Sequence, residues 1–340
     1  MNSALSIFFL ACSIILTKVF CRVAQGTRLM DKPNNRSMHS KPTIRGGGII
    51  FIGLSLISIP VLCYLTQTPF HEQLPFMLSI LLIAAVSFGD DLFTLSVRPR
   101  FLVQCIAACL IAWFMKPEQL DFGFFSISYS FLIIPLVFVL VLWSINHFNF
   151  MDGLDGFCAS QALFLCASYA ILFALHGAFF YQGFCLVLAA GLVGFLMFNF
   201  PPAKLFMGDV GSATLGLISF CVALIGQQKF QIPILFWFML NSLFLFDATL
   251  TLIRRMLHKE KWSTPHRKHA YQRLRQSGIT VPVILLGQLV LNSSFFILVI
   301  LLNMDIFIPF YVILLQIGLV VLVYCLIEKI FPMFCSEFSS

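Results

Sequence analysis

The chain has 340 residues, of which 60% are hydrophobic and only 10% are charged. Soluble globular domains carry about 25% charged residues, because charged side chains cover their surface. The composition therefore excludes a soluble globule and a disordered chain, and it predicts a protein embedded in lipid. The 11 cysteines lie mostly inside apolar runs, which also excludes a secreted disulfide framework.

Eleven apolar runs follow one another along the chain, most of them close to the length of about 20 residues that a spanning helix needs. They cover residues 4–20, 49–65, 74–88, 101–115, 129–145, 158–176, 179–198, 213–226, 232–253, 283–302 and 306–327. The runs are continuous rather than alternating, which predicts helices and not a membrane barrel. We expect an all-α integral membrane protein with about 11 transmembrane helices, folded as a single polytopic domain over residues 1–340.

Lysine and arginine are segregated between the loops that join these runs. Alternate loops, beginning with the one after the first run, together carry 18 of the 21 basic residues when the C-terminal tail is included. Basic loops tend to stay in the cytoplasm, so the pattern predicts an N-terminus outside and a C-terminus in the cytoplasm. The net charge of +7 is thus a topological signal and does not indicate nucleic-acid binding.

The predicted cytoplasmic loops also carry the most informative acidic residues. These loops are residues 21–48, 89–100, 146–157, 199–212 and 254–281. Five of their carboxylates are expected to converge on one face of the membrane: Asp90, Asp91, Asp152, Asp155 and Asp209. Oxygen-only clusters suit hard divalent cations, and Mg²⁺ binds through one or two carboxylates plus substrate phosphates. Zinc is disfavoured, since the chain has neither a paired-cysteine motif nor an HExxH helix.

Basic and glycine-rich segments of the same loops favour a phosphorylated substrate. Arg45 precedes three glycines, whose small size lets backbone N–H groups approach phosphate oxygens, while basic side chains neutralise them. The segment 208–212, Gly-Asp-Val-Gly-Ser, is predicted to open a helix, whose N-terminus favours anions. Together these features predict phosphoryl chemistry on a soluble phosphorylated substrate.

Several of these residues also have a simpler interpretation. Asp90 and Asp91 could mark only a solvated helix end, and Phe206 could be ordinary packing. Asp247 lies within the run 232–253, where a carboxylate is costly and by default functional. Pairing with a helical neighbour such as Arg254 explains Asp247 equally well.

Two segments carry a resemblance to a known family. They read Asn149-Phe-Met-Asp152-Gly-Leu-Asp155-Gly and Phe206-Met-Gly-Asp209-Val-Gly-Ser212. With the Asp90-Asp91 pair, they resemble the polyprenyl-phosphate N-acetylhexosamine-1-phosphate transferases, the MraY/WecA-like superfamily of glycosyltransferase family 4. The resemblance runs in the family's order from Asp31 to Gln272, and 11 spans are nearer to the WecA branch than to the ten-span MraY branch.

The resemblance implies an enzyme that transfers a sugar-1-phosphate from a UDP-sugar to undecaprenyl phosphate and releases UMP. Such a reaction initiates a lipid-linked glycan, for example O-antigen or capsule, and requires Mg²⁺, for which Mn²⁺ can substitute. It further implies a multi-pass protein of the bacterial inner membrane with its active site facing the cytoplasm, and it allows a homodimer.

The family's motifs also imply a role for individual residues. The expected catalytic residues are Asp90, Asp91, Asp209 and His269, of which the three aspartates are also the expected metal ligands. Phe206 is expected to stack on uracil. The full set of expected substrate-binding residues is Lys41, Thr43, Asn149, Asp152, Asp155, Asn199, Phe206, Gly208, Ser212, His266 and Arg267.

The last large loop departs from the family pattern. WecA-like members have a His-x-His-His run there, near the donor's phosphates, whereas this chain reads His269-Ala-Tyr271-Gln272. Only the first histidine is retained, with His266 as a candidate partner. The departure places the chain nearer to members that start glycan synthesis with 6-deoxy-N-acetylhexosamines, and it leaves the sugar open.

A polytopic secondary transporter is the main alternative. Transporters place ion-binding residues near the bilayer midplane in broken helices, and only Asp247 is clearly intramembrane in this sequence. A phosphotransferase of the CDP-alcohol type is a weaker alternative, because Asp152-Gly-Leu-Asp-Gly lacks the Ala-Arg of that signature.

Overall fold

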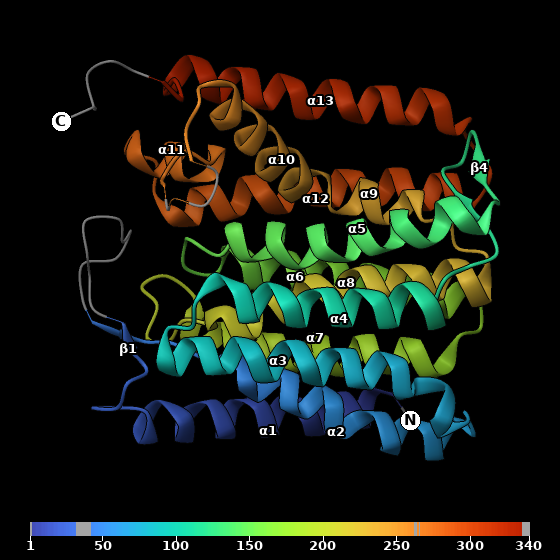
Figure 1. The fold of residues 1–340 in the computed structure, drawn as a ribbon, viewed down its shortest axis with the longest axis horizontal. Coiled ribbons are helices and arrows are strands. Elements are labelled where there is room, and N and C mark those ends of the chain that lie inside the picture. The colour runs from blue at the N-terminus through green and yellow to red at the C-terminus, as the bar shows by residue number, and fades with distance from the viewer. Residues whose placement is uncertain (1, 32–41, 262–263, 265, 335–340) are drawn as a thin grey trace. The chain divides into compact units, whose positions relative to one another are not determined.

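The computed structural model describes residues 2–31, 42–261, 264 and 266–334. Within them, ten helices are long and apolar enough to cross a membrane, so the chain is an all-α, multi-pass membrane protein (Figure 1). These helices are α1 (Asn2–Val23), α2 (Gly48–Thr66), α3 (Leu74–Phe93), α4 (Val97–Phe114), α5 (Ser130–Phe150), α6 (Phe157–Leu175), α7 (Phe179–Asn199), α8 (Gly208–Phe230), α12 (Val281–Asn303) and α13 (Pro309–Ile330).

Shorter elements join the long helices. A 3-10 turn, η1 (Phe70–Gln73), precedes α3, and three short helices lie between α8 and α12: α9 (Leu235–Leu240), α10 (Ser242–Leu257) and α11 (Ala270–Gln276). The strands β1 (Met30–Asp31) and β2 (Thr43–Ile44) pair antiparallel, as do β3 (Leu120–Asp121) and β4 (Ser126–Ile127). In both pairs the strands are only two residues long.

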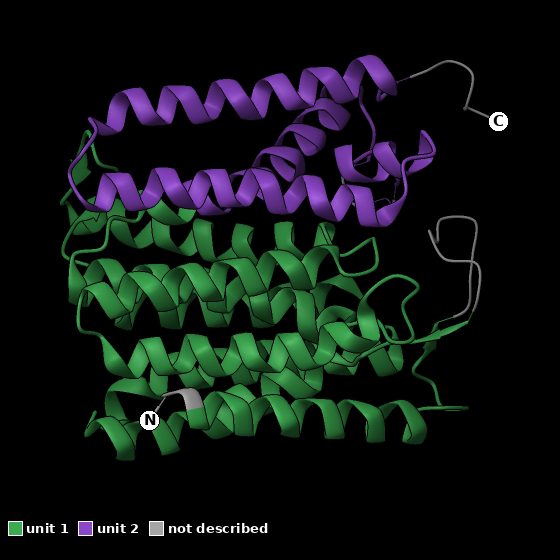
Figure 2. Ribbon diagram, turned by 180° about the vertical axis from the view of Figure 1, so that it is seen from behind, with its two compact units in different colours: residues 1–32, 41–237 green, residues 33–40, 238–340 purple. Residues whose placement is uncertain are grey.

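The chain divides into two compact units, with the boundary between Trp237 and Phe238 inside α9 (Figure 2). Unit 1 contains α1 to α8, and unit 2 contains α10 to α13. The predicted single transferase domain over residues 1–340 stays a prediction.

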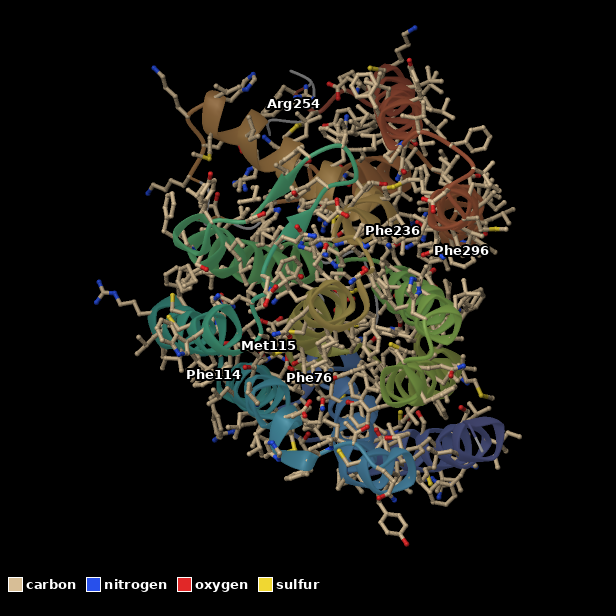
Figure 3. The ribbon with its side chains drawn as sticks, turned by 90° about the vertical axis from the view of Figure 1, so that its right-hand side faces the viewer. Phe76, Phe114, Met115, Phe236, Arg254 and Phe296 are labelled. Atoms are coloured by element: carbon tan, nitrogen blue, oxygen red, sulfur yellow. The ribbon has the colours of Figure 1, made fainter. Side chains whose placement is uncertain are left out.

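Helices α7 and α8 form the core of unit 1. Helix α8 packs against α3 and α5, and α7 packs against α1, α2 and α6. Small residues permit this close packing: a side chain at Gly48 would collide with the backbone of Gly211, and one at Gly216 would collide with the carbonyl of Ser144. Apolar side chains between helices, such as Phe76, are buried, whereas Phe114 lies on the outside of the bundle (Figure 3).

The ninth predicted span is not one continuous helix. The apolar run 232–253 is interrupted at Asn241, which separates α9 from α10 and has φ −102° and ψ 6°. Hydropathy registers only that the run is apolar, and a break in the backbone does not change that sum. Eleven spans are therefore not confirmed, and ten long helices are found in the described part of the chain.

Several helices extend beyond their apolar runs and include the polar motifs. Helix α3 continues to Phe93 and so contains Asp90 and Asp91, which the sequence assigned to a loop. Helix α4 begins at Val97 and therefore contains Arg100. A helix can extend into polar sequence because its backbone hydrogen bonds do not depend on hydropathy. Helix α3 ends at a left-handed cap residue, Thr94, whose N–H donates to the carbonyl of Asp90. The predicted boundaries thus marked the apolar section of each helix and not its end.

Candidate active site

Two carboxylates and one guanidinium meet where α3 ends and where α4 and α8 begin. Arg100 forms ion pairs with both Asp90 and Asp209, at 2.9 Å between Nη1 and Asp209 Oδ2. The N–H of Leu95 donates to the other oxygen of Asp90 at 2.6 Å. The side chains of Asp90 and Asp209 are 11% and 30% exposed, so they are shielded but accessible. Three helices thus bring together residues that are 119 positions apart at most: Asp90, Arg100 and Asp209.

Asp91 lies beside this pair but makes different contacts. It is 3% exposed, and its oxygens accept the N–H groups of Asp209 and Val210, each at 3.1 Å. These are N–H groups of the first turn of α8, where a helix has no internal acceptors. Arg45 donates to the carbonyl oxygen of Asp91 at 2.6 Å. Sequence reasoning grouped Asp91 with Asp90, whereas the contacts give Asp91 the role of a helix cap.

Asn149 and Asp152 come from the end of α5 and from the loop that follows α5. Asn149 is in the last turn of α5, beside the carboxylate of Asp209. Asp152 follows in the loop, where removal from water and the nearby carboxylates, first of all Asp209, raise its pKa from 3.8 to about 8. A carboxyl with that pKa is mostly protonated at neutral pH in the absence of a cation and can donate a hydrogen bond. Asp152 therefore lies within electrostatic reach of Asp209, Asp91 and Asp155.

Asp155 and Asn199 hold two loops together. An oxygen of Asp155 accepts the N–H of Ala203 at 2.9 Å. The amide of Asn199 accepts the N–H of Gly156 at 3.0 Å and donates to the carbonyl of Leu205 at 2.8 Å. Both ends of the buried Asn199 side chain are thus used by backbone groups. The structure gives Asn199 a structural contact where the motif predicted a substrate contact.

Phe206 is carried on a backbone segment that runs beside β2. Its N–H donates to the carbonyl of Ile44 at 2.7 Å, and its own carbonyl accepts the N–H of Gly47 at 3.0 Å. The N–H of Gly48 donates to the carbonyl of Met207 at 2.9 Å. The glycine-rich segment therefore uses two of its N–H groups for this pairing and not for phosphate, which corrects the predicted phosphate cradle. The side chain of Phe206 itself stays partly exposed.

Two further predicted substrate-binding residues, Ser212 and Thr43, are buried. Ser212 is fully buried and donates to the carbonyl of Gly208 at 3.2 Å, so it does not face a substrate in this structure. Thr43 is in β2 and 8% exposed. Lys41 lies outside the described residues.

Arg100 was missed as a site residue because its charge was interpreted only as a topological signal, although it lies ten positions after Asp90.

His269 begins a short helix in unit 2. It is 4% exposed and is the residue before α11, and its N–H donates to the side chain of Gln272 at 3.3 Å. Its Nδ1 lies 3.5 Å from an oxygen of Asp247. Tyr271 and Gln272, which replace the family's later histidines, are 3% and 8% exposed. The two replacements therefore pack within unit 2.

Asp247 has a structural partner, but not the predicted one. Its Oδ1 accepts both the N–H of Ala270 at 2.9 Å and the hydroxyl of Thr251 at 3.0 Å, so Asp247 caps α11 from α10. Arg254 instead makes a bidentate ion pair with Glu328, at 2.7 and 2.8 Å. The expectation of a structural role is consistent with these contacts, whereas Arg254 as the partner is wrong. Thr251 is one helical turn from Asp247 in the sequence, whereas Ala270 at the start of α11 is 23 residues away.

His266 lies next to His269, with 4.8 Å between ring centroids. Burial, first of all, and the neighbouring basic side chains, among them His269 and Arg255, lower the pKa of His266 from 6.5 to about 3. His266 is therefore neutral at physiological pH, and it offers a neutral imidazole and not a positive charge. Arg267 follows it, and its carbonyl accepts a hydrogen bond from Gln276 at 2.7 Å.

The donor set of unit 1 fits a divalent cation in part. Asp90 and Asp209 offer carboxylate oxygens only, and Arg100 forms an ion pair with both. A pair of carboxylates suits Mg²⁺, which binds through one or two carboxylates plus substrate phosphates. No group of three or more His, Cys, Asp or Glu side chains arranged to hold a metal is found among the described residues. The predicted set of three aspartates is thus not assembled, since Asp91 caps α8.

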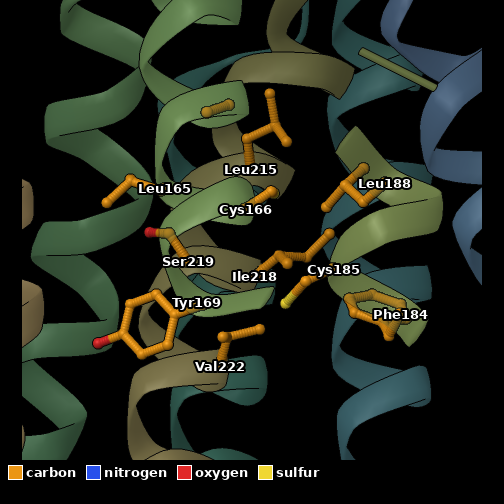
Figure 4. A pocket seen from close by; sticks show the side chains of 11 residues that line it. Leu165, Cys166, Tyr169, Phe184, Cys185, Leu188, Leu215, Ile218, Ser219 and Val222 are labelled. Carbon is orange, nitrogen blue, oxygen red and sulfur yellow. The ribbon is translucent and has the colours of Figure 1, made fainter. Parts of the chain in front are cut away.

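A small cavity inside unit 1 is not part of this site. It has a volume of about 10 Å³, room for about one water molecule, and lies among side chains of α6, α7 and α8 such as Leu165, Phe184 and Ile218 (Figure 4). It is too small for a substrate. The polar cluster at the start of α8 is separate from this cavity.

The fold and the polar cluster together define a class: a polytopic membrane protein with an acidic and basic cluster at the helix ends. Comparison with known proteins makes the class specific. A family model described as Glycosyl transferase family 4 matches residues 74–227, which contain Asp90, Asp152 and Asp209. The chain is 30% identical over 281 residues to the probable undecaprenyl-phosphate N-acetylglucosaminyl 1-phosphate transferase of Bacillus subtilis (strain 168), covering 78% of this chain and 75% of that protein.

Two further relatives agree with this assignment. The undecaprenyl-phosphate alpha-N-acetylglucosaminyl 1-phosphate transferase of Thermotoga maritima is 27% identical over 76% of this chain and 77% of its own length. The phospho-N-acetylmuramoyl-pentapeptide-transferase of Caldanaerobacter subterraneus subsp. tengcongensis is 30% identical over 56% of this chain and 63% of its own length. The chain belongs to glycosyl transferase family 4, which confirms the resemblance found in the motifs.

Proposed function

We propose that this protein transfers a sugar-1-phosphate from a UDP-sugar to undecaprenyl phosphate and releases UMP. The observation that carries the proposal is the cluster of Asp90, Asp209 and Arg100 at the start of α8. The names of two relatives, both undecaprenyl-phosphate sugar-1-phosphate transferases, supply the acceptor and the reaction type. An oxygen of the lipid phosphate attacks the β-phosphorus of the donor, the phosphoanhydride bond breaks, and UMP leaves with that bond's oxygen.

The residues of unit 1 position and neutralise the reacting phosphates. Asp90 and Asp209 would hold the metal ion, and Mg²⁺ when bound supplies charge neutralisation on the diphosphate. Arg100 offers a guanidinium for oxygens of a phosphate group once the carboxylates bind the metal. Phosphoryl transfer needs mainly such positioning and charge stabilisation. The lipid phosphate, with a second pKa near about 6, is largely ionised at neutral pH and needs little help from a base.

The nucleotide end of the donor is proposed to lie between Phe206 and the loop after α5. The ring of Phe206 offers a stacking surface for uracil. Asn149 and Asp152 both lie near Asp209 and are proposed to hydrogen-bond the nucleotide. Asp155, Asn199 and Gly208 contribute through the loop and helix start they shape.

His269, His266 and Arg267 of unit 2 are proposed to contact the donor's phosphate and sugar. His269 has a fixed position, because it begins α11 and faces Asp247. Tyr271 and Gln272 are buried and stand where the family's run has its later histidines, so only His269 of that run is retained. This departure favours a donor of the 6-deoxy-N-acetylhexosamine type. It also favours a role at the start of O-antigen or capsule synthesis.

The test is UMP release by the purified full chain in detergent, with UDP-N-acetylglucosamine and other UDP-sugars as donors. We expect release only when undecaprenyl phosphate and Mg²⁺ are both present, because the acceptor supplies the attacking oxygen. The preferred sugar is given by the highest kcat/KM in the panel. Release that is the same without undecaprenyl phosphate contradicts the transfer reaction, and no release with any donor contradicts the function as a whole. The family assignment does not favour a secondary transporter.

The orientation is part of the same proposal: the site faces the cytoplasm of a bacterial inner membrane. In unit 1 the contacts gather Asp90, Asp152 and Asp209 at one end, whereas Glu72 pairs with Lys229 at the other. The topology is tested by labelling single cysteines with a membrane-impermeant thiol reagent in intact cells, in a background without accessible native cysteines.

Cysteines beside Asp152 and His269 are expected to be labelled only after the membrane is opened. A cysteine at Phe124, an exposed residue between β3 and β4, is expected to react in intact cells and serves as the control. Labelling of the Asp152 position in intact cells would reverse the orientation.

A further inference from the structure

Asp90 and Asp91 are neighbours in the sequence, but their side chains do different things. Asp90 faces Arg100, in the partly exposed cluster with Asp209. Asp91 is 3% exposed, and each of its oxygens accepts one N–H group from the first turn of α8. A carboxylate at the start of a helix satisfies otherwise unpaired donors and complements the helix dipole.

The start of α8 supplies no cap of its own. An N-terminal cap is normally the side chain of the residue that precedes the first turn; at α8 that residue is Met207, whose side chain makes no cap hydrogen bond, and the first helical residue is Gly208, which has φ +73° and no side chain. A Cβ at this position would lie 2.5 Å from one oxygen of Asp91 and 2.8 Å from its other oxygen and its Cγ. The carboxylate of Asp91 thus fills the space that a capping side chain at residue 208 would occupy.

The cap acts directly on the proposed metal ligand. The N–H of Asp209 is one of the two groups that Asp91 holds, and the Asp209 side chain then points to Arg100 at 2.9 Å. The position of Asp91 is itself fixed, since Arg45 donates to its backbone carbonyl at 2.6 Å. Asp91, Gly208 and Arg45 form a support for Asp209 that carries no chemistry of its own.

We propose that Asp91 is a positioning residue that caps α8 from α3 and orients Asp209, and that it is neither a metal ligand nor a base. The inference rests on the proposed function for its kinetic readout. It separates the two adjacent aspartates, which the motif alone treats as one pair. It also predicts that the cap can be moved to residue 208, because only the position of the acceptor matters.

The test compares the wild type with four variants of the full chain: Asp91→Ala, Gly208→Asn, Asp91→Ala with Gly208→Asn, and Asp91→Ala with Gly208→Ala. Asp91→Ala removes the three atoms that lie nearest to a Cβ at residue 208. Asn is chosen because it tolerates positive φ and its side-chain oxygen is a good cap acceptor. The two readouts are UMP release per folded molecule, from UDP-N-acetylglucosamine and undecaprenyl phosphate, and the Tm in the same detergent.

Asp91→Ala is expected to lower both UMP release and Tm, with release falling by about tenfold, the size that a lost helix cap corresponds to. Gly208→Asn alone is expected to lower both as well, because the new side chain meets Asp91. The Asp91→Ala, Gly208→Asn variant is expected to recover most of both losses. The Asp91→Ala, Gly208→Ala variant has the same free space but no acceptor, so it is expected to recover neither.

The result that overturns the proposal is an Asp91→Ala, Gly208→Asn variant that recovers Tm but not UMP release. A carboxylate that binds metal or accepts a proton cannot be replaced by an amide on another helix, so that outcome would give Asp91 a chemical role. Recovery of neither readout would also overturn it.

The failure of the proposed function can be told apart from the failure of the cap. If the wild type releases no UMP, the proposed function fails, and the Tm values alone then decide the cap. In the Asp91→Ala background, recovery of Tm by Gly208→Asn and not by Gly208→Ala supports the cap, and any other order contradicts it.

Discussion

Replacing Asp209 by Asn is expected to lower UMP release per folded molecule by at least about 10²-fold. The change keeps the shape of the side chain but removes the charge that opposes Mg²⁺ and that pairs with Arg100. A metal ion contributes several kcal/mol to stabilising the transition state, and each tenfold in rate corresponds to about 1.4 kcal/mol. Release is measured across a titration of Mg²⁺, in which a high concentration is expected to recover part of the loss.

Two aspartates serve as controls for Asp209. Asp121 lies at the other end of unit 1, where it accepts the N–H of Gly123 at 2.7 Å, so Asp121→Asn is expected to leave release unchanged. Asp247→Asn is expected to lower the Tm more than the turnover of folded molecules, because Asp247 caps α11. Near-normal release from Asp209→Asn would remove the catalytic assignment. A loss of turnover per folded molecule in Asp247→Asn, with normal turnover in Asp209→Asn, would contradict the structural role of Asp247.

Phe206→Ala is expected to raise the KM for the UDP-sugar by about 5- to 150-fold, whereas Phe206→Trp is expected to leave it nearly unchanged. Stacking of a base on an aromatic ring contributes about 1–3 kcal/mol in single-stranded nucleic-acid proteins, and that range gives the stated change in KM. The backbone of Phe206 is held by Ile44 and Gly47, so the substitution removes the ring without releasing the segment. KM is measured from initial rates of UMP release at saturating undecaprenyl phosphate.

Phe200 is the matched control for Phe206. It lies at the start of the same loop, immediately after α7, and its side chain is 54% exposed. Phe200→Ala removes the same ring from the same loop and is expected to leave the KM for the donor unchanged. An unchanged KM in Phe206→Ala would return Phe206 to ordinary packing, and equal increases in both variants would indicate a general loosening of the loop.

The sequence predicted the site best at aspartates that belong to a local motif. Asp209 follows Gly208 at the start of a helix as expected, and Asp152 lies near it as the clustering of acids predicted. The role of Asp91 could not be predicted, because the two N–H groups that it accepts are 118 and 119 residues away. The glycines after Arg45 were misinterpreted for the same reason: their N–H groups pair with the segment at Phe206, which no local pattern reveals.

By itself, the sequence determined that this is a helical membrane protein, where ten of its helices lie, and which family it belongs to. Hydropathy and motifs are local properties, so they can be followed along the chain without knowing which helices pack together. Only the tertiary structure decided the break at Asn241, the cap that Asp91 places on α8, and the partner of Asp247. The cap and the Asp247 contact depend on where a buried carboxylate finds N–H partners across the fold, and sequence distance does not limit that choice.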